Sequence, residues 1–163
     1  MNIALLEPEI PANTGNIGRT CVVTGTSLHL IGPLGFRIDE RSLKRAGLDY
    51  WDKLDVTVYK NCEEFYNIHG NSRIWYLTTK AEKAYTEADF RPDDFLMFGK
   101  ETAGIPEEIL VANRDRCVRI PMRSDERSLN LSNAAAIVLY EALRQNGFEG
   151  LETKGRLHRM DWI

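Results

Sequence analysis

Residues 2–20 read NIALLEPEIPANTGNIGRT, and this stretch carries the pattern that decides the fold. It begins with a short apolar run, Asn2–Leu6, which is typical of a buried β-strand. Pro8 and Pro11 then mark a turn, and a helix is predicted from Asn13 onward. A buried strand, a loop and a helix in this order form the first unit of an α/β fold.

The same alternation of strands and helices continues along the chain. Short helices are predicted over Asp39–Ala46 and Pro106–Asn113. The chain has 163 residues and no repeat or linker, so we expect a single domain, residues 1–163, with a mostly parallel sheet flanked by helices. Further strands are predicted at the apolar runs Ser27–Ile31, Asp55–Tyr59, Arg73–Leu77, Asp94–Phe98 and Cys117–Ile120.

The longest predicted helix, Asn130–Asn146, ends before Gly147, a residue suited to a left-handed cap. Its apolar residues surround almost the whole helix instead of forming one stripe. Such a helix is buried on several sides, so it lies either within the core or against another subunit. Residues 150–163 follow as a polar tail in which basic residues cluster: Lys154, Arg156, His158 and Arg159.

Composition and charge exclude several classes of protein. With 21 Lys and Arg against 24 Asp and Glu, the net charge of −3 argues against bulk electrostatic coating of nucleic acid, but it allows a local basic patch. No apolar run approaches the roughly 20 residues that span a bilayer, and Glu7 and Glu9 stand in an N-terminus without secretory features. The 3 cysteines stand singly and the 3 histidines have no metal-ligand spacing. We therefore expect a cytoplasmic protein with no membrane partner and no metal.

The first of three polar loops spans residues 11–20, at the start of the first predicted helix. Asn13, Asn16 and two glycines there present backbone N–H groups that suit an anion, and Arg19 adds a positive charge. Plain capping of the helix by Asn13 or Thr14 explains the same residues. The four residues Gly15–Gly18 also match the G-x-x-G loop of KH domains, which is a weak signal.

The second and third loops follow strands. Gly99 stands directly after Asp94–Phe98, where a ligand can approach the backbone, and Glu101 offers a carboxylate to a hydroxyl or ammonium group. A tight turn before Pro106 accounts for the same pattern. The third loop, residues 120–133, is polar and precedes the long apolar helix, so it also fits an extended helix cap.

Together these loops closely resemble the three motifs of the SPOUT-class RNA methyltransferases, trefoil-knotted enzymes that use S-adenosylmethionine. The resemblance is sharpest to the subgroup that methylates the ribose 2′-hydroxyl of the wobble nucleotide in tRNA. It extends over residues 7–142 and includes Pro33–Phe36, Arg45–Tyr50 and Leu77–Lys80. It departs at three positions, where a bulkier apolar residue, a proline and an arginine are replaced by Gly18, Lys100 and Ala103.

The resemblance implies a fold, a reaction and partners. The C-terminal part is expected to form a deep trefoil knot, and the protein to act as a homodimer whose active sites are completed across the interface. The implied activity is that of an S-adenosylmethionine-dependent tRNA (cytidine(34)-2′-O)-methyltransferase, acting on cytidine and also on modified uridine, with tRNA as partner and no metal.

The resemblance also implies roles for individual residues. Arg19 is the expected catalytic residue, since a guanidinium stays protonated and stabilises or orients the attacking oxygen instead of acting as a base. The expected cofactor-binding residues are Leu77, Gly99, Glu101, Ile120, Ser128 and Asn133. The expected RNA-binding residues are Asn13, Asn16, Arg41, Arg45, Arg123 and Arg127.

Two alternatives to this interpretation stay open at the level of the sequence. One is a 2′-O-methyltransferase that acts on another site in tRNA or rRNA. The other is an RNA- or nucleotide-binding module without catalysis, which would keep the glycine-rich loop but would not need Glu101, Ser128 and Asn133 together.

Overall fold

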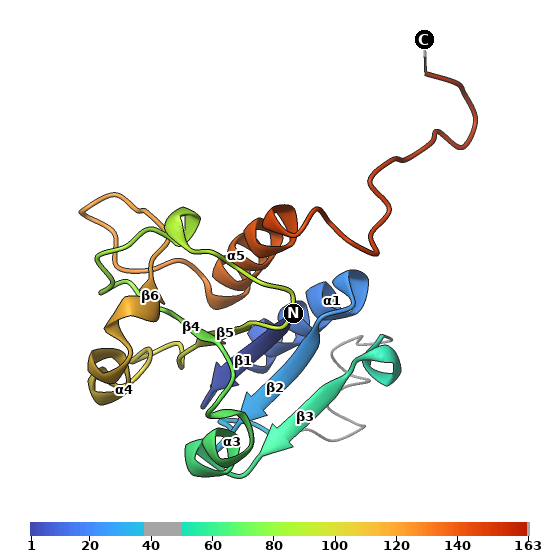
Figure 1. Ribbon diagram of the computed structural model, residues 1–163. Helices are drawn as coiled ribbons and strands as arrows, with labels where there is room; N and C mark the ends of the chain where they lie inside the picture. Colours follow the sequence, from blue (N-terminus) through green and yellow to red (C-terminus); the bar gives the residue numbers. More distant parts are fainter. Residues whose placement is uncertain (38–49, 163) are drawn as a thin grey trace.

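A computed structural model describes residues 1–37 and 50–162 of the chain (Figure 1). Its centre is a 6-stranded sheet in the order β3-β2-β1-β5-β4-β6, and every neighbouring pair is parallel. This sheet confirms the predicted parallel α/β architecture. The strands are β1 (Asn2–Leu6), β2 (Ser27–Ile31), β3 (Val56–Tyr59), β4 (Ile74–Leu77), β5 (Phe95–Phe98) and β6 (Cys117–Val118).

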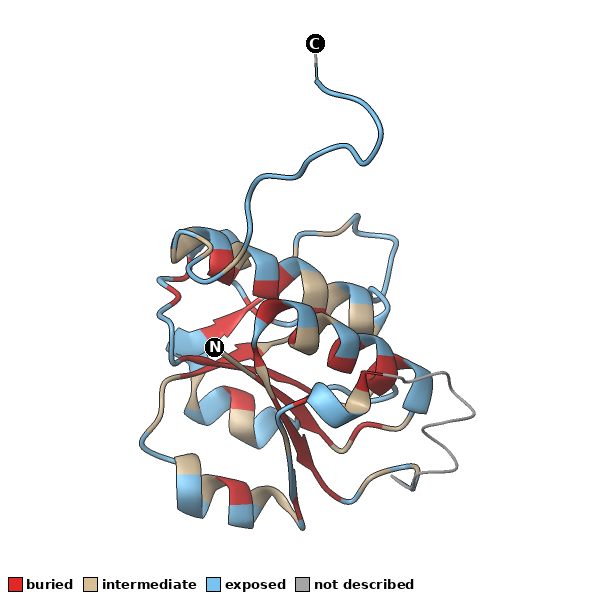
Figure 2. Ribbon diagram, turned by 90° about the vertical axis from the view of Figure 1, so that its right-hand side faces the viewer, coloured by how far each residue is buried: buried red, intermediate tan, exposed pale blue. Residues whose placement is uncertain are grey.

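Helices cover both faces of the sheet. One face packs against α1 (Pro11–Thr24) and α5 (Leu131–Gln145), which contribute Ile17 and Leu139 to the larger core cluster. The other face packs against α3 (Cys62–His69) and α4 (Glu107–Ala112), with Phe65 and Leu110 in the smaller cluster. Because β1 is covered on both sides, its run Ile3–Leu6 is fully buried, as Figure 2 shows for the central strands. Three 3-10 turns complete the described elements: η1 (Trp51–Lys53), η2 (Tyr85–Glu87) and η3 (Arg114–Arg116).

The ends of the helices follow local chemistry. Pro11 occupies the first turn of α1, where no N–H partner is needed, and Gly25 ends that helix with a φ of 65°. The side chain of Asn130 caps α5 by accepting hydrogen bonds from the N–H groups of Ser132 and Asn133. Gly147 follows α5 with a φ of 68°, as its position predicted.

The structure differs from the sequence prediction in two elements. The helix α3 was not predicted, although Asn61 caps it by accepting from Glu64 N–H while Glu64 accepts from Lys60 N–H. The last strand is shorter than Cys117–Ile120, since only a single bridge joins Arg119 to Ala84. The helix predicted over Asp39–Ala46 lies outside the described residues.

The helix α5 is not covered on all sides by its own chain. Ala135, Val138 and Leu139 are buried, whereas Ile137 and Tyr140 are 39% and 47% exposed. Val23, on the neighbouring α1, is 62% exposed. The apolar residues that surround α5 therefore form a core face and an outer face.

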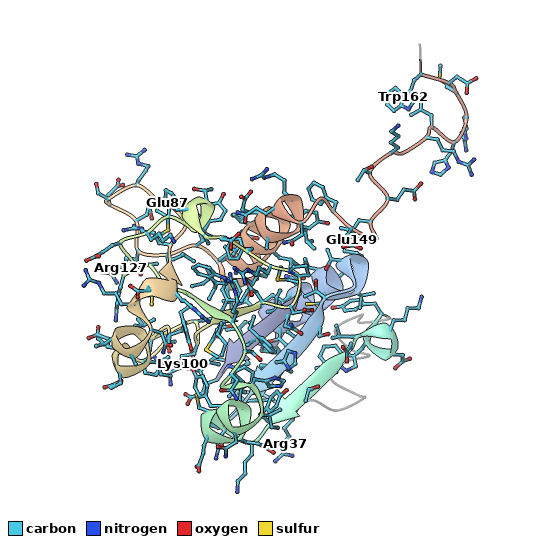
Figure 3. All side chains as sticks on the ribbon, viewed as in Figure 1. Arg37, Glu87, Lys100, Arg127, Glu149 and Trp162 are labelled. Carbon is cyan, nitrogen blue, oxygen red and sulfur yellow. The ribbon has the colours of Figure 1, made fainter. Side chains whose placement is uncertain are left out.

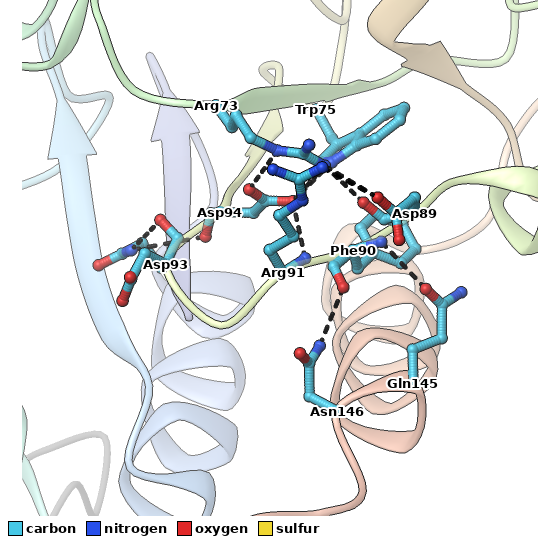
Figure 4. Close-up of polar contacts among 10 residues, drawn as sticks. Arg73, Trp75, Asp89, Phe90, Arg91, Asp93, Asp94, Gln145 and Asn146 are labelled. Carbon is cyan, nitrogen blue, oxygen red and sulfur yellow. Dashed lines mark hydrogen bonds and ion pairs between the residues drawn. The ribbon is translucent and has the colours of Figure 1, made fainter.

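A buried polar network fixes the amino-terminal edge of the sheet (Figure 4). Asp94 is 2% exposed and accepts hydrogen bonds from Arg73 Nε and Trp75 Nε1, both at 2.8 Å. Four residues earlier, Phe90 N–H donates to Gln145 Oε1, and Asn146 Nδ2 donates to Phe90 O. The segment that leads into β5 is thereby tied to the end of α5.

Among the helices of residues 1–37 and 50–162, none has the length and apolar character needed to cross a membrane.

Candidate active site

A cavity of about 550 Å³ lies at the carboxyl edge of β4, β5 and β6. Parallel strands end at the same edge of a sheet, so the loops that follow these strands meet there, and open α/β sheets bind ligands at this edge. The lining comes from residues 77–80 at the end of β4, residues 98–105 at the end of β5, and Ile10 and Asn13 at the start of α1. After β6 it includes Ile120, Met122 and residues 127–131, together with Val118 of β6 and Ala134 of α5. The volume is that of a small-molecule site.

The loop after β5 is a tight glycine turn. Gly104 has a φ of 71° and its N–H donates to Lys100 O at 2.8 Å. A Cβ built on Gly99 would lie 2.0 Å from the carbonyl carbon of Gly104, so no larger residue fits there. The turn consequently presents backbone to the cavity at a position where a ligand can approach closely.

Glu101 joins this turn to the loop after β1. Its carboxylate accepts hydrogen bonds from the N–H groups of Glu9 at 2.8 Å and Ile10 at 3.2 Å, and from Asn13 Nδ2 at 2.9 Å. Burial by itself would raise the pKa of Glu101, but the hydrogen bonds to Asn13 and to the backbone outweigh burial and lower it. Glu101 is therefore an ionised link between two loops that border the cavity.

Asn13 extends the link to the third loop. Its Oδ1 accepts a hydrogen bond from Asn130 Nδ2 at 3.0 Å, while Asn130 Oδ1 caps α5. Glu101, Asn13 and Asn130 thus form a chain of side chains that connects the three loops singled out in the sequence. Asn130 was missed as a site residue, although its position before Leu131 is that of a helix cap.

Five predicted cofactor residues border the cavity: Leu77, Gly99, Glu101, Ile120 and Ser128. Asn133 does not line it and is exposed on α5, where Asn130 lies at the cavity instead. Leu77, Ile120 and Leu131 give the cavity an apolar wall, and they also touch the larger core cluster. The lining therefore offers apolar side chains to a ring and polar groups to hydrogen-bonding partners.

Arg19 lies outside this cavity, on the exposed side of α1. Its guanidinium carbon is 4.8 Å from the centre of the Tyr50 ring, and the Tyr50 hydroxyl donates to Gly15 O. A Cβ on Gly18 would approach Leu54 Cδ2 to 3.1 Å, so the glycine lets the segment that begins at Tyr50 pack closely on α1. Arg19 is thereby held against a buried aromatic ring.

The sequence comparison places the chain in a family. Residues 1–140 match the family described as SpoU rRNA Methylase family. The chain belongs to the SpoU methylase family. A relative from Saccharophagus degradans named tRNA (cytidine(34)-2′-O)-methyltransferase is 50% identical over 150 residues, which are 91% of this chain and 97% of that protein.

Solved structures of SpoU-type enzymes share the fold. One, described as "Structural insights into the 2-OH methylation of C/U34 on tRNA", is 41% identical with a TM-score of 0.83 and covers 90% of this chain and 95% of its own. The SpoU methyltransferase AviRb from Streptomyces viridochromogenes, solved with the cofactor AdoMet, is 25% identical with a TM-score of 0.78 and covers 90% and 57% of the two chains.

Lys100, one of the three positions at which this SpoU-family chain departs from the motifs, pairs with Glu7. Lys100 Nζ donates to Glu7 Oε2 at 2.8 Å, and the carboxylate of Glu7 raises the pKa of the Lys100 ammonium. Next to this pair, Glu9 accepts from both the N–H and the hydroxyl of Thr102. Lys100 is therefore part of the same junction between the loops after β1 and β5 that Glu101 forms.

The predicted RNA-binding residues are spread over the molecule. Asn13 and Arg127 border the cavity, and Arg127 projects from the loop before α5 (Figure 3). Asn16 is exposed on α1, and Arg123 is exposed and paired with Asp125 at 3.3 Å. Arg41 and Arg45 lie outside the described residues. Within residues 1–37 and 50–162 no group of three His, Cys, Asp or Glu side chains could hold a metal ion.

Proposed function

We propose that the chain is an S-adenosylmethionine-dependent tRNA (cytidine(34)-2′-O)-methyltransferase. It would methylate the ribose 2′-hydroxyl of the anticodon wobble nucleotide, with cytidine and modified uridine as bases. The observation that carries the proposal is the cavity at which Glu101, Asn13 and Asn130 join all three loops of a SpoU-family chain. The activity named for the relative at 50% identity supports the substrate.

The cavity fits S-adenosylmethionine. Leu77, Ile120 and Leu131 would hold the adenine ring, and the backbone of the Gly99 turn would contact polar groups without a side chain in the way. Ser128 and Glu101 supply a hydroxyl and an anionic edge. When bound, the cofactor supplies a methyl group made electrophilic by its sulfonium. No metal is required by this chemistry.

The protein's contribution is to orient the ribose and to stabilise charge on the attacking oxygen. Arg19 suits this role because a guanidinium keeps its charge at any working pH and donates several hydrogen bonds in one plane. The contact with the Tyr50 ring restricts where that guanidinium can lie. Arg19 therefore orients the hydroxyl or its neighbouring phosphate and does not serve as the base.

We infer that the active form is a homodimer in which Arg19 serves the cavity of the partner subunit. Val23, Ile137 and Tyr140 form an exposed apolar surface over α1 and α5, and Arg19 lies on α1 outside its own cavity. Association through this surface would cover it and bring Arg19 to a second copy. Asn16, exposed on the same helix, would then lie near the RNA.

We further propose that the C-terminal part of the chain is threaded as a trefoil knot. In support, the segment between β4 and β5 forms hydrogen bonds with Arg119, which follows β6, and with Gln145, the last residue of α5. Tyr85 N–H donates to Arg119 O and Arg119 N–H donates to Lys83 O, while Phe90 N–H donates to Gln145 at the far end of α5. We also propose a cytoplasmic location, which the proposed tRNA substrate supports.

Arg19→Ala tests the proposed reaction. With tRNA as substrate, we expect methyl transfer to fall by at least about 100-fold, because a positioned charge is lost, while calorimetry shows unchanged binding of S-adenosylhomocysteine. Mapping of the methylated ribose should find the wobble nucleotide. Retained turnover would remove Arg19 from the mechanism, and failure of the wild-type protein to bind S-adenosylhomocysteine would overturn the proposed function.

Mixing two inactive variants tests the sharing of sites. If Arg19 acts on the partner's cavity, a mixture of Arg19→Ala with a variant defective in its own cavity, Gly99→Val, restores activity, because one site of each heterodimer is intact. A mixture that stays inactive although heterodimers form would contradict this arrangement, and so would sedimentation as a monomer at micromolar concentration.

A further inference from the structure

Residues 152–162 form an exposed terminal arm beyond α5. Leu151 still packs on the larger core cluster and donates its N–H to Phe148 O at 3.0 Å. From residue 152 onward every described residue is exposed, and the backbone extends away from the body of the protein (Figure 1). In the part of the chain that the structure describes, no hydrogen bond or ion pair joins this arm to other residues.

The arm combines positive charge with exposed apolar side chains. Lys154, Arg156 and Arg159 stand within six residues that contain no carboxylate, and His158 lies among them. Trp162 is 76% exposed and Met160 is 72% exposed. Several cations of the body are paired with carboxylates, such as Arg73 with Asp94. The charges of the arm are thus available to a partner.

This combination favours a nucleic acid over other partners. Lys and Arg on an extended backbone follow a phosphate chain and release its counterions, and an exposed indole stacks on unpaired bases. The body of the protein has a net negative charge, so it would gain from a separate cationic contact. An acidic protein surface would match the cations as well, and the loss of dimer sedimentation on truncation is the outcome that would indicate it.

We propose that the terminal arm binds the tRNA substrate, with Lys154, Arg156 and Arg159 on phosphates and Trp162 stacked on an unpaired base. This inference rests on the proposed function, because it assigns a second contact surface to the same substrate. The arm would contribute affinity outside the cavity and would take no part in methyl transfer.

The dimensions of α5 and the arm agree with such a contact. Asn130, at the start of α5, lies at the cavity, and 15 helical residues separate it from the other end of the helix. At about 1.5 Å per residue the root of the arm is some 22 Å from the cavity. Eleven residues, when fully extended, would reach up to about 35 Å further. The arm can therefore contact RNA well beyond the reacting nucleotide.

The test compares the full chain with a variant truncated after Leu151, using an unmodified tRNA transcript and saturating S-adenosylhomocysteine. We expect the tRNA affinity to fall by about tenfold or more near 0.1 M salt, and the slope of log K against log salt to become shallower by about 2 to 3, since three cations are lost. Binding of S-adenosylhomocysteine and the thermal midpoint should not change, because the arm contributes nothing to the core.

Point variants separate charge from stacking. Replacing Lys154, Arg156 and Arg159 by Gln should reproduce the shallower salt slope. Trp162→Ala should weaken tRNA binding without changing that slope, and Trp162→Phe should restore the tRNA affinity. Met160→Ala, on the same arm, is the matched control and should leave the affinity unchanged. In the full chain, tRNA should also protect Trp162 from acrylamide quenching.

The outcomes distinguish this inference from the function on which it rests. If the truncated protein binds and methylates tRNA as the full chain does, with the same salt slope, the arm is not an RNA contact and the proposed function stands. If truncation abolishes dimer sedimentation and leaves the salt slope unchanged, the arm binds protein and the inference is overturned. If the full chain binds S-adenosylhomocysteine but no tRNA, both proposals fail.

Discussion

At the amino-terminal edge of the sheet Asp94 accepts hydrogen bonds from Arg73, Trp75 and Arg91, whereas at the carboxyl edge Glu101 accepts them from Glu9, Ile10 and Asn13. Both carboxylates hold together segments that are distant in sequence. Asp94 is almost fully buried and pairs with a guanidinium, while Glu101 is partly exposed, is bound by N–H groups and borders a cavity.

This difference in burial and in partners indicates that Asp94 stabilises the fold, whereas Glu101 holds the loops around the cavity in place. A buried ion pair is costly to break, because its partner is left uncompensated. A carboxylate bound only by neutral donors costs less to change, but its loss lets the loops around the cavity move relative to one another. Variants of these two residues should therefore differ in which property they change.

Asp94→Ala is expected to have the largest effect on stability. It leaves Arg73 Nε and the indole N–H of Trp75 without their acceptor, while Arg73 Nη2 still donates to Asp89 O, so the free energy of unfolding in urea should fall by about 3 kcal/mol. Asp93→Ala is the matched control, since only the backbone carbonyl of Asp93 accepts a hydrogen bond, from Asn2. A loss below about 1 kcal/mol for Asp94→Ala would contradict the anchoring role.

Acid should destabilise the amino-terminal edge before it affects Glu101. Asn2 Nδ2 donates to the carbonyls of Asp93 and Asp94, so its Oδ1 faces His29 Nε2 and takes that N–H. The other nitrogen, Nδ1, lies 2.8 Å from the Tyr59 hydroxyl and serves as its acceptor. A proton on Nδ1 would remove that acceptor.

The pKa of His29 is lowered to about 4 by burial, then by nearby His69, with Asp55 opposing. The unfolded chain therefore binds a proton that the folded chain does not between pH 6.5 and about 4. Stability is full above pH 6.5 and should fall by up to about 3 kcal/mol as the pH drops through this window. His29→Gln should flatten that part of the urea-unfolding profile.

Glu101 loses its contribution in the same direction as His29, but at lower pH. Its pKa is lowered from 4.5, so its stabilising contribution is present above that value and is lost only as the pH falls through the lower folded-state pKa. If His29→Gln left the loss between pH 6.5 and 4 unchanged, another group would have to account for it.

Glu101→Gln should affect stability least and ligand binding most. A glutamine keeps the shape but turns one acceptor into a donor, which faces either the N–H of Glu9 or the donors of Ile10 and Asn13, so unfolding should cost about 1 to 2 kcal/mol less. The affinity for S-adenosylhomocysteine, measured by calorimetry, should fall by about tenfold. Glu107→Gln, at an exposed ion pair with Lys80, is the control. Unchanged affinity would make Glu101 a purely structural residue.

The alternation of apolar runs and turns was sufficient to predict the parallel sheet, because fully buried strands such as β1 carry uninterrupted apolar residues. The helix α3 was missed because only Phe65 of its residues is buried, and Ile68 is exposed, so its apolar pattern is weak. Its capping pair, Asn61 and Glu64, was the available signal.

The site was only partly predictable, because its decisive contacts join distant residues. Glu101 was expected to face a ligand, yet its acceptors are occupied by groups 88 to 92 residues away. Asn130 reads as an ordinary helix cap until the fold brings it to Asn13, 117 residues away. Local pattern identifies which loops matter, and only the tertiary structure shows which side chains connect them.

The contacts of Glu101, Lys100 and Thr102 with residues 7–13 also limit how this chain can change in length. An inserted or deleted residue in the loop after β1 would shift Glu7, Glu9 and Asn13 away from their partners on the turn after β5. That turn cannot adjust, because Gly99 packs directly on the backbone of Gly104. Insertions are therefore tolerated in neither loop unless the other changes with it. The two loops must therefore change together, although 88 residues of sequence, residues 11–98, lie between them.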